Sequence, residues 1–112
     1  MSLALYIVPA AVTSALLGRG VDVLTAQWDD TARRADPALL DRASALGRVL
    51  VSQDEDLLAE AARRQRTGGE FAGLIYAHQQ AVTVAGFIAD LELFARTVEP
   101  LEMINRVEFL PL

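Results

Sequence analysis

The sequence predicts a small three-layer α/β domain built on a mostly parallel central sheet of about five strands. Short apolar runs typical of strands alternate along the chain with segments of helical periodicity. The connections between successive runs are long enough for the right-handed crossovers that join parallel strands. With 112 residues, the chain is expected to form a single domain over residues 1–112.

The first strands and helix are predicted from apolar runs and from the residues that interrupt them. Leu3–Val8 is an apolar run that stops at Pro9, because proline cannot continue a central strand. Pro9 then opens a helix, which ends at Gly18. The β-branched run Val21–Thr25 is the second predicted strand, and the polar residues 27–35 are predicted to form a loop.

The pattern continues through the rest of the chain. Asp36 is suited to an N-cap and is followed by proline, so a second helix is predicted from there to Gly47. The apolar run Arg48–Ser52 is the third predicted strand. Beyond it we expect a helix from Leu57 to Arg66, a strand at Gly73–Ala77, a long helix at Val82–Val98, one turn at Leu101–Ile104 and an extended piece at Arg106–Leu110.

Composition excludes several classes of protein. The absence of cysteine excludes a disulfide scaffold and a thiolate metal site, and favours a cytoplasmic protein. The net charge is −5, and every base is arginine. This negative charge argues against general electrostatic binding to the phosphate backbone of nucleic acids. The longest apolar stretch, Leu3–Leu17, is shorter than the roughly 20 residues of a membrane span, and the first base, Arg19, follows it instead of preceding it as in a signal peptide.

The segment 52–56 (Ser-Gln-Asp-Glu-Asp) places three carboxylates between a predicted buried strand and a helix. In an open parallel sheet, ligands bind beyond the carboxyl ends of the strands. Asp54 and Asp56 could share Mg²⁺ or Mn²⁺ there, and Asp36 could add a ligand from the preceding helix. Such an ion would polarise a phosphoryl oxygen and activate water for phosphodiester cleavage.

The same segment also has a purely structural interpretation. Ser52 and Glu55 fit the S-x-x-E capping box, and either aspartate suits the first turn of a helix. This interpretation is the more common one for such a pattern, although capping by Ser52 is compatible with metal binding by Asp54 and Asp56.

Other side chains are weaker candidates. Arg63 and Arg64 could hold RNA phosphates, and with Ser52 they are the candidate substrate-binding residues, but cations near a helix C-terminus also complement its dipole. His78 follows a predicted strand and could donate a proton, although a lone histidine in a loop is more often a surface residue. Trp28 could stack on a base or pack against the sheet edge.

Four segments together carry a resemblance to a known family. They are residues 19–26, Asp36 with Pro37, residues 47–56 and residues 73–76, and the most specific is the Arg-Val-Leu-Val-Ser-x-Asp-x-Asp pattern within 48–56. In these segments the chain resembles the small PIN-like family of unknown function whose members are predicted ribonuclease toxins of toxin–antitoxin pairs, related to VapC-type toxins. The resemblance covers nearly the whole chain.

The resemblance implies a PIN-like parallel sheet, Mg²⁺ or Mn²⁺ dependence and cleavage of RNA. It implies that Asp54 and Asp56 are metal ligands and that Asp36 matches the acid at the head of the preceding helix. Its implied partners are a small antitoxin and a second copy of the chain, as a homodimer. The chain departs from the family at the end of the first strand, where an aspartate is expected and Tyr6–Pro9 contains no acid.

Two functional hypotheses therefore stay open. One is a metal-dependent ribonuclease in which an acid elsewhere, such as Asp29 or Asp30, replaces the missing one. The other is a catalytically inactive PIN-like module that keeps its binding surfaces. A receiver-like or nucleotide-binding module ranks last, because the chain has no lysine and no phosphate-binding loop.

Overall fold

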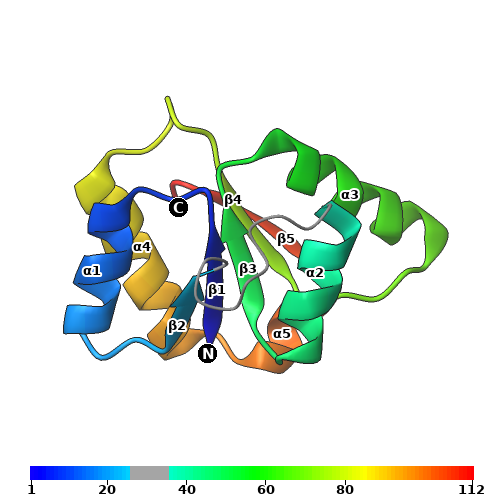
Figure 1. Cartoon of the computed structure of the whole chain (residues 1–112), viewed down its shortest axis with the longest axis horizontal. Coiled ribbons are helices and arrows are strands. Elements are labelled where there is room, and N and C mark those ends of the chain that lie inside the picture. The colour runs from blue at the N-terminus through cyan, green and yellow to red at the C-terminus, as the bar shows by residue number, and fades with distance from the viewer. Residues whose placement is uncertain (26–35) are drawn as a thin grey trace.

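A parallel five-stranded sheet forms the centre of the described part of the chain, residues 1–25 and 36–112 of a computed structural model (Figure 1). The side chain of Asp36 also lies outside the description. The strands follow the order β2-β1-β3-β4-β5, and every neighbouring pair is parallel. The predicted α/β class is thus confirmed. The elements are β1 (Leu3–Tyr6), α1 (Ala10–Gly18), β2 (Val23–Thr25), α2 (Asp36–Ala45), β3 (Val49–Ser52), α3 (Glu55–Thr67), β4 (Leu74–Ala77), α4 (Val84–Thr97), α5 (Pro100–Met103) and β5 (Val107–Leu110).

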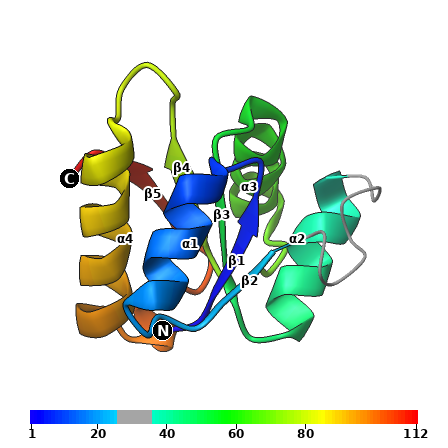
Figure 2. The same ribbon diagram turned by 60° about the vertical axis from the view of Figure 1, so that its left-hand side comes forward.

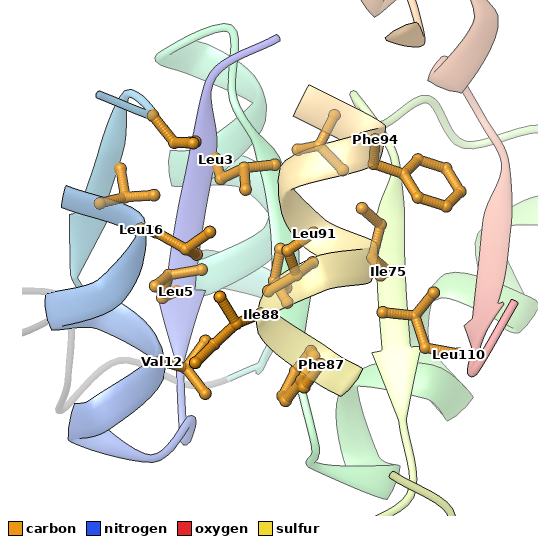
Figure 3. Packing of buried hydrophobic residues seen from close by; sticks show 14 of the residues in the cluster. Leu3, Leu5, Val12, Leu16, Ile75, Phe87, Ile88, Leu91, Phe94 and Leu110 are labelled. Atoms are coloured by element: carbon orange, nitrogen blue, oxygen red, sulfur yellow. The ribbon is translucent and has the colours of Figure 1, made fainter. Parts of the chain in front are cut away.

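Helices cover both faces of the sheet and give the three layers (Figure 2). Side chains of α1 and α4 pack on one face, in an apolar cluster that includes Leu16, Phe87 and Leu91, each at most 1% exposed (Figure 3). Side chains of α2 and α3 pack on the other face, where Leu40 and Leu57 are fully buried. Burial of β3 and β4 on both faces explains why their sequences read as continuous apolar runs.

The sheet order places a reversal of direction next to β1. The chain runs from β1 outward to β2, then crosses back to β3 on the other side of β1. Leu3 accordingly pairs with Val23 on one side and with Val49 on the other. In open parallel sheets, ligands bind at such a reversal, beyond the carboxyl ends of the two central strands. The ends of β1 and β3 are therefore the first place to look for a site.

Several element boundaries differ from the sequence-based ones. The first strand ends at Tyr6 instead of Val8, because Ile7 adopts a left-handed φ of 53° that no strand residue can keep. The long helix starts at Val84, since Thr83 caps it through an Oγ1 that accepts a hydrogen bond from the Gly86 N–H at 3.0 Å. The turn and the extended piece expected near the end of the chain are present as α5 and β5.

Within residues 1–25 and 36–112, no helix is both long enough and apolar enough to cross a membrane.

Candidate functional site

Ser52 and Asp54 shape the junction between β3 and α3. Ser52 is the last residue of β3, is fully buried, and accepts a hydrogen bond through its Oγ from the Asp54 N–H at 3.0 Å. Asp54 is the N-cap of α3, and its Oδ1 accepts from the Asp56 N–H at 3.0 Å. The segment does cap α3, as the structural interpretation predicted, but the prediction that Ser52 is the cap is wrong. Ser52 stays in the sheet, where it pairs with Tyr6 on one side and with Tyr76 on the other.

Asp56 lies in the first turn of α3 and is exposed, as is Glu55 beside it. An acid in this turn is favoured by the partial positive charge of the helix N-terminus. One oxygen of Asp54 is already engaged by the Asp56 amide, so the two aspartates are held together through the backbone of the cap. This part of the segment therefore has a complete structural explanation before any ion is considered.

Glu55, a residue that the sequence indicated only as part of a cap, faces the neighbouring strand end. Its Oε1 lies 3.8 Å from Nε2 of His78, which follows β4. The His78 Nδ1 accepts a hydrogen bond from the Gln80 N–H at 3.1 Å, so neutral His78 carries its proton on Nε2, toward Glu55. Tyr76 belongs to the same group: burial, followed by the nearby charges of Glu55 and Asp54, raises the pKa of its hydroxyl.

The pairing of Ser52 with Tyr76 brings this group together, and no pattern in the sequence shows that β3 and β4 are neighbours. This pairing places the residues that follow β3 beside those that follow β4. We refer to Asp54, Glu55, Tyr76 and His78 as the strand-end cluster.

Asp36 is positioned away from this cluster by its own helix. The carbonyl of Pro37, the next residue, accepts a hydrogen bond from the Arg64 guanidinium at 3.0 Å. Arg64 lies ten positions after Asp54 on α3, or about 15 Å along the helix axis. The backbone of Asp36 thus lies beside the last turns of α3, whereas Asp54 and Asp56 lie at its first turn.

Arg63 and Arg64 are committed to protein contacts at that same distant end of α3. Arg63 donates two hydrogen bonds to Glu60, at 3.0 and 2.7 Å. The Arg64 side chain is 8% exposed and contacts Glu60 and Asp41, both at 2.8 Å, besides the Pro37 carbonyl. The structure does not bring either arginine to the strand ends, and their substrate-binding role stays a prediction. Arg64 instead links α2 to α3 through its contacts with Asp41 and Pro37.

A hollow of about 240 Å³ lies at the carboxyl ends of β1, β3 and β4. No charged residue is among the described residues that line it: Pro9, Gln53, Gln79, Val82, Thr83, Val84 and Phe87. Phe87 belongs to the apolar cluster beneath α1 and α4, whereas Tyr76 belongs to the cluster beneath α2 and α3. The hollow and the strand-end cluster therefore lie on opposite sides of the sheet. We refer to the former as the strand-end hollow.

The implied Mg²⁺ or Mn²⁺ does not fit the donor set that the described residues provide. Across residues 1–25 and 37–112, no three Asp, Glu or His side chains gather closely enough to hold a metal ion. Tyr6, the last residue of β1, and Ile7 and Val8, which follow it, offer no carboxylate. Asp36 starts its helix far from Asp54, and a hard divalent cation with only Asp54 and Asp56 would lack the ligands that fix its position.

Comparison with known proteins identified no relative of the chain. No protein-family model, no curated protein and no solved structure matches the chain. Trp28, Asp29 and Asp30, which the sequence suggested as stacking or replacement residues, lie outside the described residues.

Proposed function

We propose that the protein is a non-catalytic binding module of the small PIN-like lineage, which binds a small antitoxin-type protein at the carboxyl ends of its strands. The observation that carries this proposal is the neutral lining of the strand-end hollow. A phosphodiesterase site built on a divalent cation needs carboxylates at this position. The residues here are instead apolar side chains, Thr83 and the amides of Gln53 and Gln79.

Such a lining suits a segment of protein. Apolar side chains of the partner would bury against Val82 and Val84, while the two glutamine amides can hydrogen-bond its backbone. Val84, which lines the hollow, is 46% exposed. A large apolar side chain left half in water beside a hollow is typical of a protein-binding surface.

The test is co-expression of the chain with the product of a short open reading frame adjacent to its gene. We expect the two proteins to co-purify, and we expect Val84→Asp to abolish the complex by placing a charge on the rim of the hollow. Val84 is the first residue of α4, whose first turn holds no acid, so an aspartate there should not weaken the helix. The matched control is Leu101→Asp, which puts the same charge on α5, outside the hollow.

Co-purification that is unaffected by Val84→Asp would place the partner elsewhere and contradict the proposal. So would the absence of an adjacent frame whose product binds the chain.

A metal-dependent ribonuclease is the second candidate, and one observation favours it. Asp54 is the N-cap of α3 and Asp56 lies in its first turn, directly after a central strand, and Glu55 between them lies 3.8 Å from His78. Incubation of the chain with RNA and Mg²⁺ or Mn²⁺ distinguishes the two candidates. Chelator-sensitive cleavage that is lost in both Asp54→Asn and Asp56→Asn would establish the nuclease and overturn the non-catalytic proposal.

A further inference from the structure

Strand β5 is an exposed edge of the sheet (Figure 1). All four residues of β3 and of β4 are buried, whereas in β5 Val107 and Glu108 are half-buried and Phe109 is 59% exposed. Among the strands that the structure describes, only β4 pairs with β5. An edge of this kind presents backbone donors and acceptors to any chain that can add a strand.

The hydrogen-bond pattern identifies which groups face outward. The Leu74 N–H donates to the Arg106 carbonyl at 3.0 Å, so that carbonyl points toward β4. Because backbone groups alternate in direction along a strand, the N–H and C=O groups of Val107 and Phe109 point away from β4. Nothing in residues 1–25 or 36–112 hydrogen-bonds to these groups.

Large apolar side chains flank this edge on both faces of the sheet. Phe109 lies on the face of α2 and α3, where its ring meets Tyr76 edge to face with centroids 6.0 Å apart. On the opposite face, the Leu112 N–H donates to Asp90 of α4 at 3.3 Å, and Leu93 lies one turn beyond Asp90 on that helix. Leu93 and Leu112 are 51% and 63% exposed.

We propose that a second copy of this chain pairs with β5 as an antiparallel strand about a twofold axis, so that the two sheets form one continuous sheet. The edge is self-complementary when Val107 of each copy lies opposite Phe109 of the other. Every outward N–H and C=O of these two residues then has a partner, and each pair joins an aromatic to a β-branched side chain. Such an interface uses the same patch on both copies, as a closed dimer requires.

Other registers satisfy fewer of these groups. Pairing Val107 with itself runs into Asn105, whose φ of 61° takes it out of the strand. Pairing Phe109 with itself places Val107 opposite Pro111, which has no N–H to donate. The favoured register is therefore the one that joins Val107 to Phe109 of the second copy.

The favoured register also sets a charge relationship across the dimer. It brings Glu108 of one copy directly opposite Glu108 of the other, and each carboxylate already holds its own Arg106 at 2.8 Å. The arginines offset the repulsion between the two acids. This arrangement predicts opposite effects for two neutral substitutions: Glu108→Gln strengthens the dimer, and Arg106→Gln weakens it.

The experiment is sedimentation and light scattering of the purified chain across a range of concentrations. We expect a monomer–dimer equilibrium in the micromolar range. We expect Phe109→Thr and Val107→Pro each to raise the dissociation constant by about tenfold or more, the effect of losing interface hydrogen bonds or apolar contact. Val107→Pro removes only an outward N–H, so the bonds to β4 remain, and Phe109→Thr keeps a residue suited to strands.

Leu101→Thr is the control, since Leu101 is 81% exposed on α5 and takes no part in the strand pairing. Amide hydrogen exchange gives a second readout: the Val107 and Phe109 amides should become protected as the concentration rises, while the Leu74 amide is protected throughout. A chain that stays monomeric to about 100 μM, or a dimer that is indifferent to both edge variants, would overturn the proposal. Val84→Asp does not touch this edge, so failure here is distinguishable from failure of the antitoxin-type complex.

Discussion

The Nε of Arg64 lies 2.8 Å from Oε2 of Glu60, one turn earlier on α3, and both side chains are at most 10% exposed. Glu60 also receives two hydrogen bonds from Arg63. Arg64 in turn reaches across to Asp41 and to the Pro37 carbonyl on α2. The carboxylate of Glu60 thus orients the guanidinium that joins the two helices on this face of the sheet.

Low pH should lower the stability of the fold by protonating Glu60. Hydrogen bonds from Arg63 first, and then from Arg64, lower the pKa of this carboxyl from its ordinary 4.5 to about 2, against the opposing effect of burial. Because the folded-state pKa is the lower one, the stabilisation is fully present above pH 4.5 and is lost as the pH falls toward 2. We expect Glu60→Gln to lower the free energy of unfolding at pH 7 by about 1–2 kcal/mol, with screening by water limiting the effect.

Urea denaturation at pH 7 and at several pH values below 4.5 checks this prediction. The variant should show a shallower loss of stability over the acid range than the unmodified chain. Parallel pH profiles for the two proteins would contradict the assigned role of Glu60.

Asp54 should behave as a cap in stability measurements. Asp54→Ala removes the acceptor for the Asp56 N–H and should lower the free energy of unfolding by about 0.5–2 kcal/mol. Asp54→Ser keeps an acceptor and should recover most of that loss, whereas the control Asp56→Asn should change stability by only a few tenths of a kcal/mol. Equal losses for the alanine and serine variants, in thermal or urea unfolding, would show that capping is not what Asp54 contributes.

Gly73 should tolerate no side chain. Its φ is +129°, and a Cβ there would lie 2.6 Å from the Met103 carbonyl oxygen. We expect Gly73→Ala to lower the free energy of unfolding by about 2–4 kcal/mol, because the backbone of α5 would have to move. Gly18→Ala is the matched control: a Cβ at Gly18 meets nothing within 4 Å, and alanine favours the helix that ends there. A small effect at Gly73 would mean that α5 shifts freely.

Ile7 should be strained in its present conformation. A β-branched residue with a φ of 53° is unfavourable, and its side chain is half exposed, so burial offsets little of the cost. Ile7→Gly should therefore raise the free energy of unfolding by about 1 kcal/mol, despite the greater entropy of glycine in the unfolded chain. Thermal unfolding of this variant beside Val8→Gly, whose backbone shows no positive φ, separates strain relief from a general effect of glycine.

Local sequence patterns predicted the helices and strands. They failed where the position or role of a residue depends on contacts with residues distant in the sequence. Asp36 with Pro37 correctly marked the start of a helix, because the fixed φ of proline favours the first turn of a helix wherever it lies in the fold. The predicted strand Arg48–Ser52 ends where β3 ends, but Ser52 was wrongly assigned as the cap of the next helix: it pairs with Tyr6 and Tyr76 in the sheet, and Asp54 is the N-cap. The local pattern alone does not distinguish a serine that ends a strand from a serine that caps the following helix.

The candidate site shows the same division. From the sequence, Asp54 and Asp56 were predicted to lie just beyond the end of a strand. The structure places them there, because both follow β3 closely in the chain. The sequence could not show that Glu55 meets His78, which depends on β3 and β4 being neighbours. It also could not show that Arg64 is buried, since its partners Asp41 and Pro37 come from another helix.

The central position of β1 affects how the chain folds during synthesis. Translation delivers Leu3–Tyr6 first, yet one side of this strand pairs with Val49–Ser52, more than forty residues later. Until the ribosome has released those residues, β1 can pair only with β2, and Ala4 and Tyr6 lack the helices that later cover their face. The nascent protein therefore carries an apolar, half-paired strand for much of its translation, which is the kind of segment that molecular chaperones bind.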